Sequence, residues 1–144
     1  MKKWLSLDHG WLLIYITMIN ISNGWVIYPF FIKQKIKFFC YSGINEEAGE
    51  FWECETDDHI YTEKYPHEIG KFCFDIIAGH IHTFEIAEEP YFNEIYYDGY
   101  SHYYIDSDFL KSEKLSILMY DTKIRKYYSV SKDGDIPIYA YDSV

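Results

Sequence analysis

The chain has 144 residues, of which 49% are apolar and 21% aromatic, and it carries a formal net charge of -10 at pH 7. This length fits one domain over residues 1–144, and so much apolar sequence excludes an intrinsically disordered chain. The negative charge opposes direct binding to nucleic acid, because contacts to phosphate need Lys and Arg.

The N-terminal third contains a long apolar stretch, residues 11–32, which is long enough to cross a bilayer. Polar residues and Pro29 interrupt it, and a membrane-spanning helix seldom combines such residues. Asn23 and Gly24 lie between two apolar runs, and because both accept positive φ they predict a β-hairpin with a type I′ turn. We therefore expect strands here and no membrane span.

Further along the chain, short runs of alternating polarity are separated by turn residues, which is typical of antiparallel strands. The predicted strands are residues 35–41, 49–56, 71–76, 80–87, 115–120, 124–130 and 136–141. Helical periodicity is scarce, and the best helix candidates are residues 5–16, 65–72 and 106–112. The sequence predicts a mainly β protein, an antiparallel meander that is barrel-like or a strongly twisted sheet, with one or two short helices. An α+β fold is the alternative.

The three cysteines, Cys40, Cys54 and Cys73, have no metal-binding spacing and fall within predicted strands. A free cysteine in such a position usually behaves as a small buried apolar side chain. Their odd number argues against the disulfide framework of a small secreted protein. We expect reduced thiols and a cytoplasmic protein.

Acidic residues are concentrated in the middle of the chain: residues 44–110 hold seventeen acidic and two basic residues, whereas the flanking segments are slightly positive. If residues 49–56 form a strand, alternation places Glu53 and Glu55 on one face and Trp52 and Cys54 on the other. A basic partner would relieve the repulsion within such a ridge. A solvated face without a partner is the alternative. The predicted partner-binding carboxylates are Glu46, Glu47, Glu50, Glu53, Glu55, Asp57 and Asp58.

A tyrosine-rich segment follows, at residues 91–104. Tyrosine combines a large apolar ring with a hydroxyl group and is enriched in binding hot spots. We therefore predict that Tyr96, Tyr97, Tyr100 and Tyr103 are anchors of the same binding surface. The alternative is a half-exposed sheet with aromatic cross-strand pairs.

His80 and His82 lie two residues apart in a predicted strand, so their side chains would point the same way and could share a metal ion. Glu85, Glu88 and His102 are candidates for further ligands. The stretch resembles the first half of a cupin motif, but Ile86 or Ala87 stands where that family has a glutamate. A small β-barrel metal-binding protein or enzyme using His80 and His82 is one alternative function, and a purely structural histidine pair is the other interpretation.

The chain contains no P-loop, dinucleotide-binding fingerprint, GxSxG or HExxH motif, so we predict a protein that is not an enzyme and has no cofactor. A small acidic chain with reduced cysteines and no such motif resembles the immunity proteins that bacteria pair with polymorphic toxins, including those of contact-dependent growth inhibition. The resemblance is one of size, charge and absence of motifs over the whole chain. It implies binding to a cognate basic toxin domain, often a nuclease, whose active or substrate-binding surface is covered. An acidic mimic of nucleic acid that inhibits another basic protein is a further alternative.

Overall fold

The computed structural model describes residues 11–14, 31–34 and 37–142, with side chains from residue 37 onward. The predicted hairpin turn at Asn23 and Gly24 lies outside these residues, as does most of the helix predicted over residues 5–16. The described part of that predicted helix, Trp11–Ile14, is strand β1, so a helix there is wrong. Within the described part of the chain, no helix combines the length and apolar character needed to span a membrane.

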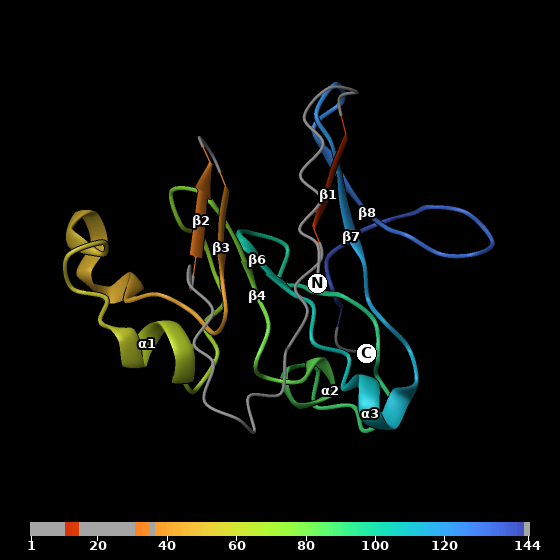
Figure 1. Ribbon diagram of the computed structural model, residues 1–144, viewed down its shortest axis with the longest axis horizontal. Coiled ribbons are helices and arrows are strands. Elements are labelled where there is room, and N and C mark those ends of the chain that lie inside the picture. Colours follow the sequence, from red (N-terminus) through yellow and green to blue (C-terminus); the bar gives the residue numbers. More distant parts are fainter. Residues whose placement is uncertain (1–10, 15–30, 35–36, 143–144) are drawn as a thin grey trace, which may run out of the picture.

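One sheet, which we call the meander sheet, has four strands in the order β1-β7-β8-β9 with every pair antiparallel. Its last three strands follow one another along the chain, as the alternation of polarity predicts. Figure 1 shows β1, β7 and β8 standing together on one side of the molecule. The strands are β1 (Trp11–Ile14), β7 (Leu118–Asp121), β8 (Lys126–Ser129) and β9 (Ile136–Pro137).

The second sheet, the mixed sheet, has five strands in the order β2-β3-β4-β6-β5. Its three central strands are parallel, which the sequence does not predict, and its outer pairs are antiparallel. Parallel neighbours need long crossover connections, and here these carry the acidic segment and all but the last of the short helices. The strands are β2 (Phe31–Gln34), β3 (Lys37–Cys40), β4 (Asp75–Ala78), β5 (Tyr96–Tyr97) and β6 (His102–Tyr104). The mainly β class is confirmed, and in the described part neither sheet closes into a barrel.

The helices of the described part are all short: η1 (Glu46–Phe51), α1 (Asp58–Glu63), α2 (Thr83–Ile86) and α3 (Phe109–Ser112). Asp57 caps α1, because its carboxylate accepts a hydrogen bond of 2.9 Å from the Ile60 amide. The turn predicted over residues 106–112 is confirmed as α3. The helix predicted over residues 65–72 is wrong: Pro66 lacks an amide donor, and Gly70 has φ +119, which no helix tolerates.

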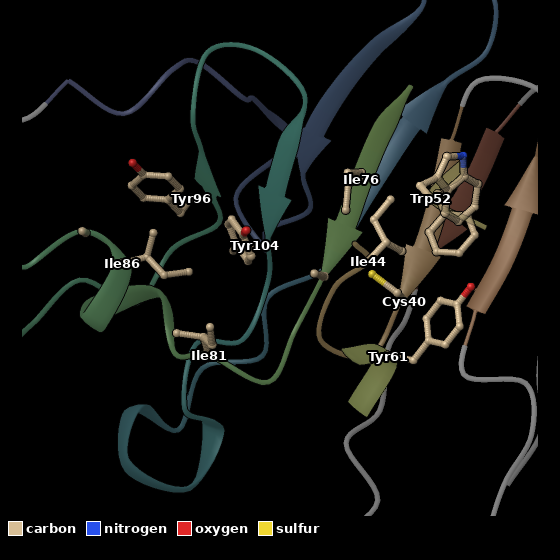
Figure 2. Close-up of a cluster of buried hydrophobic side chains, with 12 residues drawn as sticks. Cys40, Ile44, Trp52, Tyr61, Ile76, Ile81, Ile86, Tyr96 and Tyr104 are labelled. Carbon is tan, nitrogen blue, oxygen red and sulfur yellow. The ribbon is translucent and has the colours of Figure 1, made fainter. Parts of the chain in front are cut away.

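The mixed sheet is buried on both faces, and the side chains of β3 alternate between two hydrophobic clusters. Phe38 and Ile76 belong to the first cluster, which α1, α2 and the segment around Trp52 cover (Figure 2). Phe39 and Ile77 belong to the second, which joins the mixed sheet to Leu118 and its neighbours in the meander sheet. The mixed sheet is therefore the central layer, between the meander sheet and the helices.

Two predicted strands are wrong. Residues 49–56 form the end of η1 and a turn, because Gly49 has φ +57 and Thr56 folds back to accept a hydrogen bond of 2.9 Å from the Asn45 amide. Residues 80–87 also leave the extended conformation, since His80 has φ +69 and α2 begins at Thr83. As a result, His80 and His82 do not lie on a common strand.

The cysteine prediction is partly wrong. All three are free thiols, but Cys40 alone is buried, whereas Cys54 and Cys73 are exposed. Cys54 lies in the turn after η1, and its thiol contacts the Phe51 carbonyl. Cys73 precedes β4, on the exposed side of the alternation that buries Phe72 and Phe74 in part.

Candidate protein-binding surface

The acidic residues from 46 to 63 form one projecting segment, which we call the acidic protrusion. It consists of η1, the turn that follows and α1, and Figure 1 shows it at one end of the molecule, beyond the edge of the mixed sheet. The segment contains no Lys or Arg. Its exposed carboxylates include six of the seven that the sequence predicts: Glu47, Glu50, Glu53, Glu55, Asp57 and Asp58.

A single exposed aromatic ring, Phe51, lies among these carboxylates and is 68% exposed. An apolar ring surrounded by charge is the arrangement of a binding hot spot with a polar rim. The sequence analysis missed Phe51 because its exposure depends on the turn after η1, and no periodicity of the sequence reveals that turn. Its neighbour Trp52 is buried and anchors the segment, with ring centroids 4.9 Å from Phe38 and 5.2 Å from Phe74.

Glu46, the first residue of the acidic protrusion, differs from the other six because it is half-buried and paired. His102 donates from Nε2 to Glu46 Oε1 at 2.9 Å and from Nδ1 to Asp98 Oδ2 at 2.8 Å. Neither carboxylate can donate in return, so both ring nitrogens carry protons and His102 is an imidazolium. The His102 side chain is 1% exposed, so its positive charge lies inside the protein between the two carboxylates.

The pKa values of this group follow from its contacts. Burial alone would lower the pKa of His102, but the hydrogen bonds to Asp98 and Glu46 outweigh it and raise that pKa to about 9. Burial alone would raise the pKa of both carboxyls, yet the hydrogen bonds that they accept hold the pKa of Glu46 and of Asp98 below their ordinary values. The three groups are therefore charged together at neutral pH.

Asp98 also fixes the loop between β5 and β6. Its carboxylate accepts hydrogen bonds from the backbone amides of Gly70 at 2.7 Å, Tyr100 at 2.8 Å and His102 at 3.0 Å. Tyr100 is the residue at the tip of this loop, and its side chain is 65% exposed. The chain Tyr100, Asp98, His102 and Glu46 thus joins the tyrosine-rich segment to the start of the acidic protrusion.

The other predicted tyrosine anchors do not project from the surface. Tyr96 and Tyr103 are buried in the first and second hydrophobic clusters, and half-buried Tyr97 stacks on Tyr103 with ring centroids 4.3 Å apart. These residues are core because the mixed sheet is covered on both faces, so a partner cannot reach Tyr96 or Tyr103. Of the four predicted tyrosines, Tyr100 alone remains a candidate contact.

The alternative metal site at His80 and His82 loses its premise, because the two residues do not share a strand. His80 packs on the Tyr41 ring at 5.3 Å, whereas His82 lies beside Asp106. His102, a candidate third ligand, is bound on both nitrogens. Across the described residues, no group of three or more His, Cys, Asp or Glu side chains has an arrangement that could hold a metal ion.

The fold and this surface define an acidic, mainly β protein with a projecting carboxylate-rich segment. Comparison of the chain with protein-family models, with curated proteins and with solved structures finds no match.

Proposed function

We propose that this protein is an immunity protein, an inhibitor that binds a basic toxin domain through the acidic protrusion. The observation that carries the proposal is the placement of seven exposed carboxylates, the six predicted ones and Glu63, together with exposed Phe51 on one segment that has no Lys or Arg. Phe51 is the proposed apolar anchor, and the carboxylates are its charged rim.

Charge supports a basic partner. Like charges on one segment repel one another, and a partner that brings Lys and Arg removes this repulsion and is drawn in by the field of the segment. A nuclease presents such groups to the phosphates of RNA or DNA. Covering them with carboxylates would block the substrate, which is how inhibition follows from binding.

A firm base under the protrusion favours tight binding, since a segment that is already ordered loses little conformational entropy on association. Trp52 anchors the segment to the core through its ring contacts with Phe38 and Phe74. Lys64, at its far end, donates to the Ile44 carbonyl and pairs with Glu68 at 2.9 Å. We place the protein in the cytoplasm, where the exposed thiols of Cys54 and Cys73 would stay reduced.

The direct test is binding and inhibition of the toxin domain encoded by the neighbouring gene, because immunity genes lie beside those of their toxins. Association should be measured by stopped-flow fluorescence at several salt concentrations for the wild type and for an E50K/E55K variant. We expect the variant to associate at least tenfold more slowly and with a weaker dependence on salt.

A matched control is a D133K/D135K variant, which makes the same change in formal charge. Both aspartates are exposed and lie in the loop between β8 and β9, at the opposite end of the molecule from the acidic protrusion (Figure 1). The proposal requires a much smaller effect from this control. Equal effects from the two variants would mean that net charge matters and the protrusion does not.

A further inference from the structure

The three parallel strands of the mixed sheet end at the same edge. The residues that follow them are Tyr41 after β3, residues 79–83 after β4 and residues 105–108 after β6. Figure 1 shows α2 and α3 together at this edge, away from the acidic protrusion. In open sheets with parallel strands, ligands bind outside the carboxyl ends of the strands, because loops from neighbouring strands converge there.

Polar side chains from two of these loops meet at close range. His82 Nδ1 lies 3.3 Å from Asp106 Oδ1, and His82 Nε2 lies 4.0 Å from Asp108 Oδ2. The Thr83 amide donates to the Asp106 carbonyl at 2.8 Å, which fixes one loop against the other. The two carboxylate side chains are only 8% and 10% exposed. We call this group the strand-end cluster: His82, Thr83, Asp106 and Asp108.

The strand-end cluster has unused hydrogen-bonding capacity. Among the described residues, two of its buried side-chain oxygens, Thr83 Oγ1 and Asp106 Oδ2, have no hydrogen-bond partner. His82 Nδ1 faces Asp106 Oδ1 at 3.3 Å, and Asp108 Oδ2 is paired only with the exposed Lys111. Buried polar atoms nearly always have partners, since leaving one without costs as much as a lost hydrogen bond. Such atoms lying together at one edge of a sheet therefore indicate a ligand-binding site.

Backbone conformation supports the same conclusion. His80 has φ +69 and Asp108 has φ +49, values that residues other than glycine adopt at a cost. Both lie in the loops that carry the strand-end cluster. Strained residues of this kind gather at binding and catalytic sites, where the surrounding structure holds them in place.

The chemistry of the atoms indicates the class of ligand. Asp106 Oδ2, and Asp108 Oδ2 once Lys111 is displaced, are carboxylate oxygens, which only accept hydrogen bonds, so the ligand must bring N–H donors and positive charge. A metal ion is disfavoured because the described residues contain no group of three or more suitable side chains arranged to hold one. Lys111 already places an ammonium group at this position: its Nζ lies 2.9 Å from Asp108 Oδ2 and 5.7 Å from the Phe84 ring centroid.

Lys111 is loosely held, because its side chain is 78% exposed and comes from the short helix α3. A cation with several N–H groups can displace it and reach Asp108 Oδ2, and the Phe84 ring, stacked on His82 at 5.4 Å, offers a face for cation–π contact. We propose that the strand-end cluster binds an ammonium or guanidinium group in place of Lys111. The group belongs either to a free polyamine or to an arginine side chain of another protein, and the proposal does not depend on toxin binding.

The test is a titration followed by NMR of the His82 ring protons and the Thr83 amide. The probes are methylguanidinium chloride and spermidine, with tetramethylammonium chloride, a cation without N–H donors, as the control at equal ionic strength. We expect saturable shifts with at least one of the first two and none with the control. Saturation by methylguanidinium alone identifies an arginine side chain as the source, and saturation by spermidine alone identifies a polyamine.

Variants separate binding from a structural role. K111A removes the internal competitor and should strengthen binding about threefold or more. The control is K114A: Lys114 is also exposed but pairs with Glu94, so its replacement should leave binding unchanged. D106N should weaken binding at least tenfold. If D106N fails to fold, the comparison of K111A with wild type still tests whether a cation binds in place of Lys111. The proposal is overturned by the absence of saturation with both probes, by saturation with tetramethylammonium, by saturable binding of MgCl2 at the same signals, or by a K111A variant that binds no more tightly than wild type.

Discussion

His102 Nε2 lies 2.9 Å from Glu46 Oε1, so a buried imidazolium joins strand β6 to the first residue of the acidic protrusion across 56 positions of sequence. Its other nitrogen is held by Asp98, which in turn fixes the loop that carries Tyr100. This contact fixes the start of the protrusion relative to the sheet.

Replacing His102 with Gln should lower the free energy of unfolding by about 3 kcal/mol, because Glu46 and Asp98 would lose the buried charge that balances theirs. Urea unfolding monitored by circular dichroism measures the change. H59Q is the matched control, since His59 pairs with Glu63 on the exposed surface of α1 and its loss should cost less than about 1 kcal/mol. Similar losses in the two variants would contradict the buried pairing.

Stability should fall between about pH 6.5 and pH 9. The pKa of His102 is raised in the folded protein, from an ordinary value of 6.5 to about 9. A raised pKa stabilises the fold fully below pH 6.5, and this contribution is lost as the pH rises through the folded value. The difference corresponds to at most roughly 3 kcal/mol. Urea unfolding at pH 6.5 and at pH 9 should show the decrease for wild type and a much smaller one for H102Q.

An opposite dependence should appear in acid. The pKa values of Glu46 and Asp98 are lowered in the folded protein, so their contribution is present above the ordinary values and is lost as the pH falls through the folded values. We therefore expect a maximum of stability near pH 5 to 6. A stability that rises steadily from pH 6.5 to 9 in wild type would contradict the His102 argument, and a stability that does not fall as the pH drops below the ordinary carboxyl values would contradict the argument for Glu46 and Asp98.

Exposed Phe51 and buried Trp52 should behave in opposite ways when each is replaced with Ala. F51A should change the free energy of unfolding by less than about 1 kcal/mol, because its ring is already in water, but should weaken binding to a basic partner by at least 2 kcal/mol, or roughly thirtyfold. W52A should cost about 3 to 5 kcal/mol of stability, because it removes a buried ring packed on Phe38 and Phe74. An F51A variant with unchanged affinity would remove Phe51 from the proposed surface.

Some elements of this structure can be predicted from the sequence, and each wrong prediction has a physical cause. The meander of β7, β8 and β9 is local, so alternation and the turn at Gly134 predict it. The tyrosine assignment fails because Tyr103 and Tyr104 are adjacent yet both buried, which happens only when a sheet is covered on both faces. The layers that cover the sheet come from segments distant in sequence, so no local sequence pattern predicts them.

The acidic segment shows a different kind of failure. Exposed Glu53 and buried Trp52 are both as predicted, although the strand that was meant to produce them is absent. A turn around one buried ring gives the same pattern of exposure as an alternating strand over a few residues. Similarly, the strand-end cluster could not be predicted, because it depends on the parallel order of β4 and β6 and on loops that begin after each strand.

A last prediction concerns Lys37, which is buried between the sheets. Its Nζ lies 3.2 Å from the Tyr120 ring centroid, and Tyr120, Tyr127 and Tyr103 follow one another with centroids 4.7 Å and 4.2 Å apart. The ammonium therefore ends a column of tyrosine rings that joins the two sheets. A cation over an aromatic face in a desolvated place is worth about 1 to 2 kcal/mol.

A double-mutant cycle with K37M and Y120L isolates that interaction. Met keeps the length of the side chain and removes the charge, so K37M alone should change stability by little, because the burial cost of the ammonium offsets part of its attraction to the ring. Y120L should destabilise the wild type by about 1 kcal/mol more than it destabilises K37M, as measured by urea unfolding. Additive effects would show that Lys37 and Tyr120 contribute through packing alone.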